Sequence, residues 1–122
     1  MNQSSNPSAR HRAAVAVLVV VAAVVHFLRA AADPHITVLF TLNGLGFLTL
    51  LAGVLFAPPR IRRIVRWVLV AYAGATAGLY VYWAAFGDGE WLFPYGPISF
   101  VAEVLLIMLL VRQNRREAKP AT

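Results

Sequence analysis

The feature that most constrains this chain is the apolar stretch 97–111, PISFVAEVLLIMLLV, which contains a single carboxylate, Glu103. A soluble protein of 122 residues has too little interior to bury this stretch together with the other apolar runs of the chain. Hydrophobic residues make up 60% of the sequence and charged residues only 13%, which is far from the soluble average. We therefore expect an integral membrane protein that tolerates an acid within the membrane.

Three further apolar runs predict three more membrane-spanning helices. The four helices are expected at about residues 13–28, 36–57, 64–86 and 97–111. A polar and disordered tail is expected at 1–12, and a basic tail at 112–122. Because the connections are short, we expect an all-α fold: one antiparallel up-down bundle of four transmembrane helices.

The first apolar run has a second interpretation. Arg10 and Arg12 precede the run and three alanines follow it at 30–32, a pattern that is also typical of a secretory signal peptide. His26 and Arg29 lie awkwardly close to such a cleavage site, and a retained helix fits better with three later spans. Whether the first helix is cleaved stays open.

Basic residues lie mainly on one side of the expected bundle. The N-terminal tail, the turn between the second and third helices and the C-terminal tail are rich in arginine, whereas the other two connections hold one arginine beside three acids. By the positive-inside rule, both termini and the middle turn are expected in the cytoplasm, with the bundle in the plasma membrane. The net charge of +6 thus reflects orientation, and the expected partner is the lipid bilayer. No nucleic acid is expected, and a homo-oligomer or a larger membrane complex stays open.

Polar side chains within the expected spans fall in the outer half of the membrane. At about 1.5 Å per residue, His26 lies near the outer end of the first helix, and the other three lie one to two turns in from the outer ends of theirs: Asn43, Tyr80 and Glu103. An ionised acid at this depth costs about 3 kcal/mol or more, so Glu103 should be protonated or should face a partner or water. One interpretation is an outward-opening pocket for a ligand, an ion or a titrating proton. The other is an interhelical clasp in which His26 donates a hydrogen bond to Glu103 or Asn43.

Small residues indicate where helices approach one another closely. Gly44 and Gly46 lie within the second helix, and Gly74 and Gly78 lie four residues apart in the third. Glycines at such positions let helix backbones pack together in lipid. For Gly74 and Gly78 a groove for a neighbouring helix of the same chain is favoured over a seam between two copies.

The sequence does not indicate enzyme chemistry. It contains no cysteine, which excludes a disulfide framework, a thiolate metal site and covalent c-type haem. It has no Ser-His-Asp set, no glycine-rich phosphate loop and no paired carboxylates within the spans. A zinc site needs three or four ligands, which the polar cluster barely approaches. We expect no catalytic residues, no cofactor and no metal.

The polar positions and short motifs resemble those of a family of small uncharacterised four-helix integral membrane proteins of archaea and actinobacteria. The resemblance covers about residues 24–111 and is carried by His26, the segment NGLGF at 43–47, the arginine-rich turn, Tyr82-Trp83 and Glu103. It implies a bundle and a membrane location and brings no activity. Small multidrug resistance transporters are similar in size and also have one intramembrane Glu, but theirs is in the first helix, where this chain has only His26.

These observations favour a small multi-pass membrane protein that acts as a non-enzymatic accessory or ligand-binding component. The alternative is a small proton-coupled transporter. In that alternative Glu103 exchanges a proton for substrate, and oligomerisation through Gly74 and Gly78 builds the pathway.

Overall fold

The computed structural model describes residues 7–87 and 95–118, and every regular element in these two ranges is an α-helix. The helices are α1 (Pro7–Ala32), α2 (Thr37–Phe56), α3 (Pro59–Phe86) and α4 (Tyr95–Ala118). Each of the four is long and apolar enough to cross a membrane, which is the pattern of a small multi-pass membrane protein. The predicted all-α class with four such helices is confirmed.

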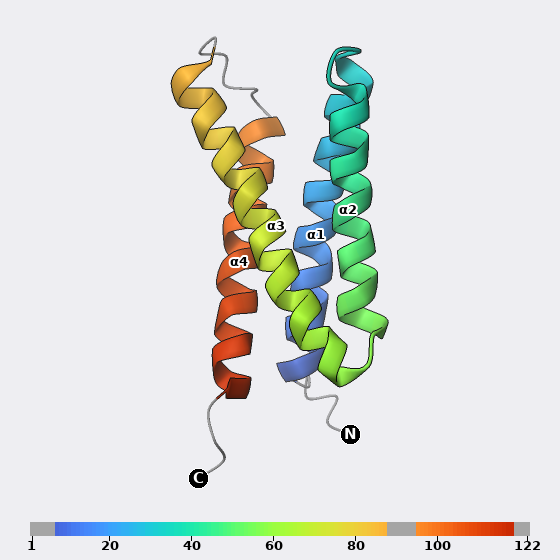
Figure 1. The fold of residues 1–122 in the computed structure, drawn as a ribbon, viewed down its shortest axis with the longest axis vertical. Helices are drawn as coiled ribbons and strands as arrows, with labels where there is room; N and C mark the ends of the chain where they lie inside the picture. The colour runs from blue at the N-terminus through green and yellow to red at the C-terminus, as the bar shows by residue number, and fades with distance from the viewer. Residues whose placement is uncertain (1–6, 88–94, 119–122) are drawn as a thin grey trace.

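The four helices form a closed ring in which α1 contacts α2 and α4, and α3 contacts the same two helices. Successive helices run in alternating directions (Figure 1). The start of α1, the α2–α3 turn and the end of α4 therefore lie together at one end of the bundle, which we call the basal end; we call the opposite end the distal end.

Three of the helices extend further than predicted. The predicted disordered tail is wrong for residues 7–12, which form the start of α1, and the predicted basic tail is helical as far as Ala118. The third helix begins at Pro59 instead of residue 64, because a proline in the first turn lacks only an N–H that would have no helical partner. Hydropathy reports which residues suit lipid, whereas Arg, Gln, Glu and Ala continue a helix into water with little cost. Residues 1–6 and 119–122 of the predicted tails, and the connection 88–94, lie outside the described residues.

The hydrophobic core fills the basal and middle parts of the bundle. Its buried side chains come from all four helices and include Val15, Val19, Phe47, Leu69, Leu106 and Leu110. The opposite face of each helix carries exposed large apolar side chains such as Val17, Leu45, Val68 and Leu105. A helix that is apolar both inside and outside fits a lipid environment, where the outer face needs no polar residues.

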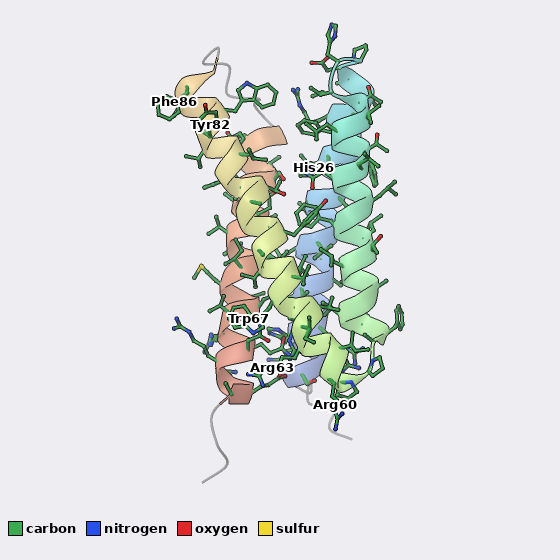
Figure 2. The ribbon with its side chains drawn as sticks, in the orientation of Figure 1. His26, Arg60, Arg63, Trp67, Tyr82 and Phe86 are labelled. Carbon is green, nitrogen blue, oxygen red and sulfur yellow. The ribbon has the colours of Figure 1, made fainter. Side chains whose placement is uncertain are left out.

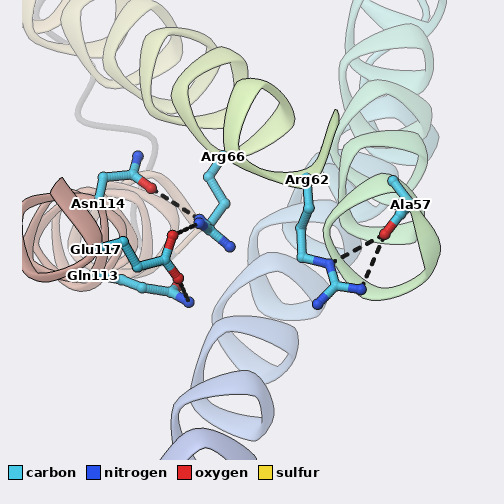
Figure 3. Close-up of polar contacts among 6 residues, drawn as sticks. All are labelled: Ala57, Arg62, Arg66, Gln113, Asn114 and Glu117. Carbon is cyan, nitrogen blue, oxygen red and sulfur yellow. Dashed lines mark hydrogen bonds and ion pairs between the residues drawn. The ribbon is translucent and has the colours of Figure 1, made fainter. Parts of the chain in front are cut away.

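Two arginines bind the last carbonyl groups of α2 at the basal end. Arg62 of α3 donates from Nε and Nη2 to the Ala57 carbonyl at 3.2 and 3.0 Å (Figure 3). Arg12 of α1 donates from Nη2 to the Leu55 carbonyl at 3.4 Å. The final carbonyls of a helix have no partner within it, and cations are favourable there. Part of the basic character of this end therefore serves the fold.

A second basal contact joins α3 to α4 through a buried arginine. Arg66 is only 4% exposed, and its Nε donates to the Asn114 side-chain carbonyl at 2.8 Å. Its Nη2 forms an ion pair with Glu117, which also accepts a hydrogen bond from Gln113 at 3.3 Å (Figure 3). Sequence reasoning placed Arg66 in the arginine-rich turn and Asn114 and Glu117 in the basic tail, so it missed this contact.

The four predicted packing glycines lie in different surroundings. A Cβ at Gly44 would come within 2.7 Å of the Phe27 ring of α1, and a Cβ at Gly46 would overlap the Tyr72 hydroxyl of α3. Gly74 has one ordinary neighbour, Ile107 of α4, at 4.0 Å, and nothing lies within 4 Å of a Cβ built on Gly78. Gly78 is exposed, so the groove expected at Gly74 and Gly78 does not hold a neighbouring helix along its length.

The small residues that α3 does bury are Ala73 and Ala77. They lie one position before Gly74 and Gly78, and one residue is a rotation of about 100° around a helix. The sequence shows a row of small residues on α3, but it does not show which part of that row faces the bundle.

Candidate functional site

A cavity of about 360 Å³ lies in the distal half of the bundle, and all four helices line it. We call it the distal cavity. Toward the distal end α3 leans away from α2 (Figure 1), whereas the basal half is filled by the core. The four predicted site residues all line this cavity: His26 from α1, Asn43 from α2, Tyr80 from α3 and Glu103 from α4.

Glu103 is the most deeply buried acid in the described part of the chain, with 1% of its surface exposed. The Ser99 hydroxyl, one turn earlier on α4, donates a hydrogen bond to Glu103 Oε1 at 2.8 Å. Residues four apart lie on the same face of a helix, so both side chains point into the cavity from α4. Among residues 7–87 and 95–118, the hydrogen bond to Glu103 therefore comes from its own helix.

His26 is buried against aromatic rings and is also bonded within its own helix. Its Nδ1 lies 2.6 Å from the Ala22 carbonyl, and a carbonyl only accepts, so Nδ1 is the donor. The ring centroid lies 5.4 Å from that of Phe40 and 5.6 Å from that of Phe47. Figure 2 shows His26 in the distal half, between the α1–α2 pair and α3. In the neutral ring Nε2 is left as an acceptor.

The backbone and the side chain of Asn43 have different roles. Its backbone carbonyl accepts a hydrogen bond from the Tyr72 hydroxyl at 2.7 Å, which ties α2 to α3. Its side-chain Oδ1 is buried and has no hydrogen-bond partner among residues 7–87 and 95–118. A buried amide oxygen without a partner is costly, which indicates a place for a donor from outside the chain.

Aromatic side chains form much of the remaining wall. Tyr80 packs against Phe100 with ring centroids 5.5 Å apart. It also passes close to Gly96, where a Cβ would lie 2.5 Å from the Tyr80 ring. Tyr82 and Trp83 line the cavity near the distal end of α3. The cavity thus has apolar walls with a small number of polar groups, as small-molecule sites commonly do.

The predicted clasp is not formed. His26 bonds to Ala22 and Glu103 to Ser99, each within its own helix, so the expected hydrogen bond from His26 to Glu103 or Asn43 is replaced by local bonds. Local partners are favoured because residues one turn apart are held at bonding distance by the helix itself. The polar groups of this cluster line a cavity instead of joining the helices across it.

Sequence reasoning missed three polar residues of the cavity wall: Arg29, Thr76 and Ser99. Ser99 escaped notice although its spacing of four from Glu103 is a usable signal. Arg29 was assigned to a connection, but α1 continues to Ala32, so Arg29 lies one turn beyond His26 and lines the same cavity. Its Nε is buried and has no hydrogen-bond partner in the described part of the chain.

The described residues show no candidate metal site, and comparison with known proteins gives no match. Within residues 7–87 and 95–118 no three His, Cys, Asp or Glu side chains are grouped in a way that would hold a metal ion. No protein-family model, curated protein or solved structure matches the chain. The distal cavity is therefore the feature of the molecule that indicates a function.

Proposed function

We propose that this chain is a non-enzymatic ligand-binding or accessory protein of the cytoplasmic membrane, and that it holds a small and largely apolar molecule in the distal cavity. The observation that carries the proposal is that one cavity of about 360 Å³ collects His26, Asn43, Tyr80 and Glu103 from four different helices. An ionisable residue within a membrane-spanning helix, here Glu103, is a candidate functional site by default.

The orientation we propose puts the basal end in the cytoplasm and opens the distal cavity toward the outside. Exposed arginines are concentrated at the basal end, among them Arg60 and Arg63 (Figure 2) and Arg112, Arg115 and Arg116. Basic residues remain preferentially on the cytoplasmic side. Membership of the small four-helix family that the sequence resembles stays part of this proposal.

The proposal is tested by titrating 1-octanol into the full chain in nanodiscs, with Trp83 as the reporter. Trp83 lines the cavity; the other two tryptophans, Trp67 and Trp91, are replaced by Phe. We expect a saturable change in Trp83 emission, because an apolar molecule that enters the cavity alters the surroundings of the indole. A linear change equal to that in the matched controls would reflect partition into the bilayer and would contradict the proposal.

Two phenylalanine variants supply those controls. Thr76→Phe fills the cavity, because Thr76 lines it and its hydroxyl bonds only to the Tyr72 carbonyl one turn earlier. Ala75→Phe adds the same ring at the next position, which is exposed and does not line the cavity. We expect Thr76→Phe to abolish the saturable change and Ala75→Phe to keep it.

The proton-coupled transporter remains the second candidate, and the presence of Glu103 on the cavity wall is the observation in its favour. A carrier must also open toward the other side of the membrane. The basal half holds buried Val15, Leu69, Leu106 and Leu110 and the Arg66 contact, which a carrier would have to separate. We therefore favour binding over transport.

A further inference from the structure

We infer that the distal cavity selects a ligand with an apolar body and a protonated amine as its head group. This inference rests on the proposed function and adds the chemical class of the ligand. The hydrogen-bonding atoms of the cavity wall are of two kinds, those that already have a partner and those that do not.

Three residues of the cavity wall leave hydrogen-bond acceptors over; Arg29 Nε, a donor without a partner among the described residues, lies nearer the distal end. Asn43 Oδ1 is buried and has no partner among the described residues. His26 donates through Nδ1 to Ala22, which leaves Nε2 as a lone-pair acceptor in the neutral ring. Glu103 accepts one bond from Ser99, and a carboxylate has room for about four. Three helices thus present acceptors to one space.

Two hydroxyl donors of the cavity wall are already engaged. Ser99 donates to Glu103 at 2.8 Å, and Thr76 donates to the Tyr72 carbonyl at 2.9 Å. Neither of these two hydroxyls is therefore free to donate to a ligand that brings only acceptors. An ammonium group brings three donors and no acceptor, and its positive charge compensates a carboxylate that the membrane otherwise disfavours.

The side chains of the cavity wall indicate the chemistry of the rest of the ligand. Most of the lining is apolar or aromatic and includes Leu39, Phe40, Leu79 and Phe100. An inorganic ion would therefore lose its hydration water on entering the cavity and would find few polar groups to replace it. An apolar body is stabilised by contact with these side chains. Aromatic faces also attract an organic cation.

Charge on the wall is distributed along the depth of the cavity. Among the described residues that line it, Glu103 is the one acid and Arg29 the one permanently charged base. Arg29 lies three residues beyond His26 in the last turn of α1, about 4.5 Å further toward the distal end. Its charge is favourable beside the carbonyl ends of α1. The amine head therefore belongs at the level of Glu103, below Arg29.

The test compares three molecules with the same eight-carbon body and different heads: octylamine, 1-octanol and octanoate. Each is titrated at pH 7 into the Trp83 reporter protein in nanodiscs of zwitterionic lipid, and the Thr76→Phe signal is subtracted as partition into the bilayer. We expect octylamine to bind about tenfold more tightly than 1-octanol, since a charge-assisted hydrogen bond is roughly twice as strong as a neutral one, and this difference in free energy corresponds to about a tenfold change in affinity. Octanoate should bind most weakly.

Two variants assign the preference to the acceptors. Glu103→Gln keeps the shape of the side chain and removes the charge, so the affinity for octylamine should fall about tenfold while that for 1-octanol changes less than about twofold. Asn43→Leu removes the unpartnered oxygen and leaves Glu103 in place, so the affinity for octylamine should fall about threefold. Circular dichroism of each variant checks that the helices remain.

The outcomes separate this inference from the proposed function. If octanoate binds most tightly and Arg29→Gln abolishes its advantage, the cavity takes an anion and the inference is wrong, although a binding site remains. Equal affinities for all three heads would also overturn the inference, because the wall would then not distinguish donors from acceptors. If even 1-octanol gives no saturable signal, the proposed function fails as well.

Discussion

The guanidinium Nε of Arg66 and the side-chain oxygen of Asn114 lie 2.8 Å apart and join the basal halves of α3 and α4. Arg66 is 4% exposed and Asn114 1%, so neither group can exchange this bond freely for one to water. Arg66 also forms an ion pair with Glu117, whose side chain is 44% exposed. Water therefore screens this ion pair, and it contributes little to the stability of the bundle. The buried hydrogen bond is the stronger part of the contact.

Replacing Arg66 should therefore destabilise the bundle. For Arg66→Ala we expect a loss of about 2 kcal/mol, because a buried hydrogen bond to a charged group is removed and Asn114 Oδ1 is left without its donor. Arg63→Ala is the matched control, since Arg63 is exposed in the same turn and should change stability by less than about 0.5 kcal/mol. Thermal unfolding of both variants in one detergent measures the difference. Equal melting temperatures would contradict the role given to this contact.

Alanine substitutions at a glycine of α2 and at a glycine of α3 should have different effects on thermal stability. A Cβ at Gly46 overlaps the Tyr72 hydroxyl, which itself donates to the Asn43 carbonyl. Gly46→Ala should therefore cost about 1–3 kcal/mol through overpacking. Gly78→Ala meets nothing within 4 Å and should leave stability unchanged or raise it by up to about 1 kcal/mol, since Ala favours a helix. A larger loss for Gly78→Ala would point to a second copy packed against this face.

The proposed orientation is measurable because the chain contains no cysteine. Cysteine replaces either His35, which is exposed between α1 and α2, or Arg115, which is exposed near the end of α4. With a membrane-impermeant maleimide on intact cells, we expect labelling of His35→Cys and none of Arg115→Cys. After lysis both should react. Labelling of Arg115→Cys on intact cells would reverse the orientation.

A measurement of octylamine flux distinguishes a binding protein from a transporter. In proteoliposomes with a pH gradient, a binding protein should not accelerate octylamine accumulation beyond that of empty vesicles, and Glu103→Gln should behave the same. Gradient-driven uptake that Glu103→Gln abolishes would establish the carrier instead, because a carboxyl that exchanges its proton for the ligand is then required.

The bundle was predictable from the sequence because a membrane leaves the backbone few options. Apolar runs in lipid must satisfy their own hydrogen bonds, so long runs such as 36–57 predict helices directly. The helix ends were not predictable, because residues 7–12 and 112–118 are polar yet suit a helix, and hydropathy does not measure helix propensity.

The candidate site was predictable only in part. Counting depth along each helix placed His26, Asn43, Tyr80 and Glu103 in the outer half of the membrane, and all four line one cavity in the structure. Which partner each polar group takes depends on rotation about the helix axis. That rotation decides that His26 bonds to Ala22 and not to Glu103, and weakly patterned apolar helices do not encode it in sequence.

The most direct test of the whole account is an infrared difference spectrum of the lipid-reconstituted protein with and without octylamine, compared with Glu103→Gln. Glu103 is the one carboxyl on the cavity wall among the described residues, so its stretching band should change when the amine enters the cavity. The account predicts a difference band that saturates with octylamine, is absent from Glu103→Gln and is blocked in Thr76→Phe. A Glu103 band that octylamine leaves unchanged would contradict it and would leave this carboxyl a structural group of α4.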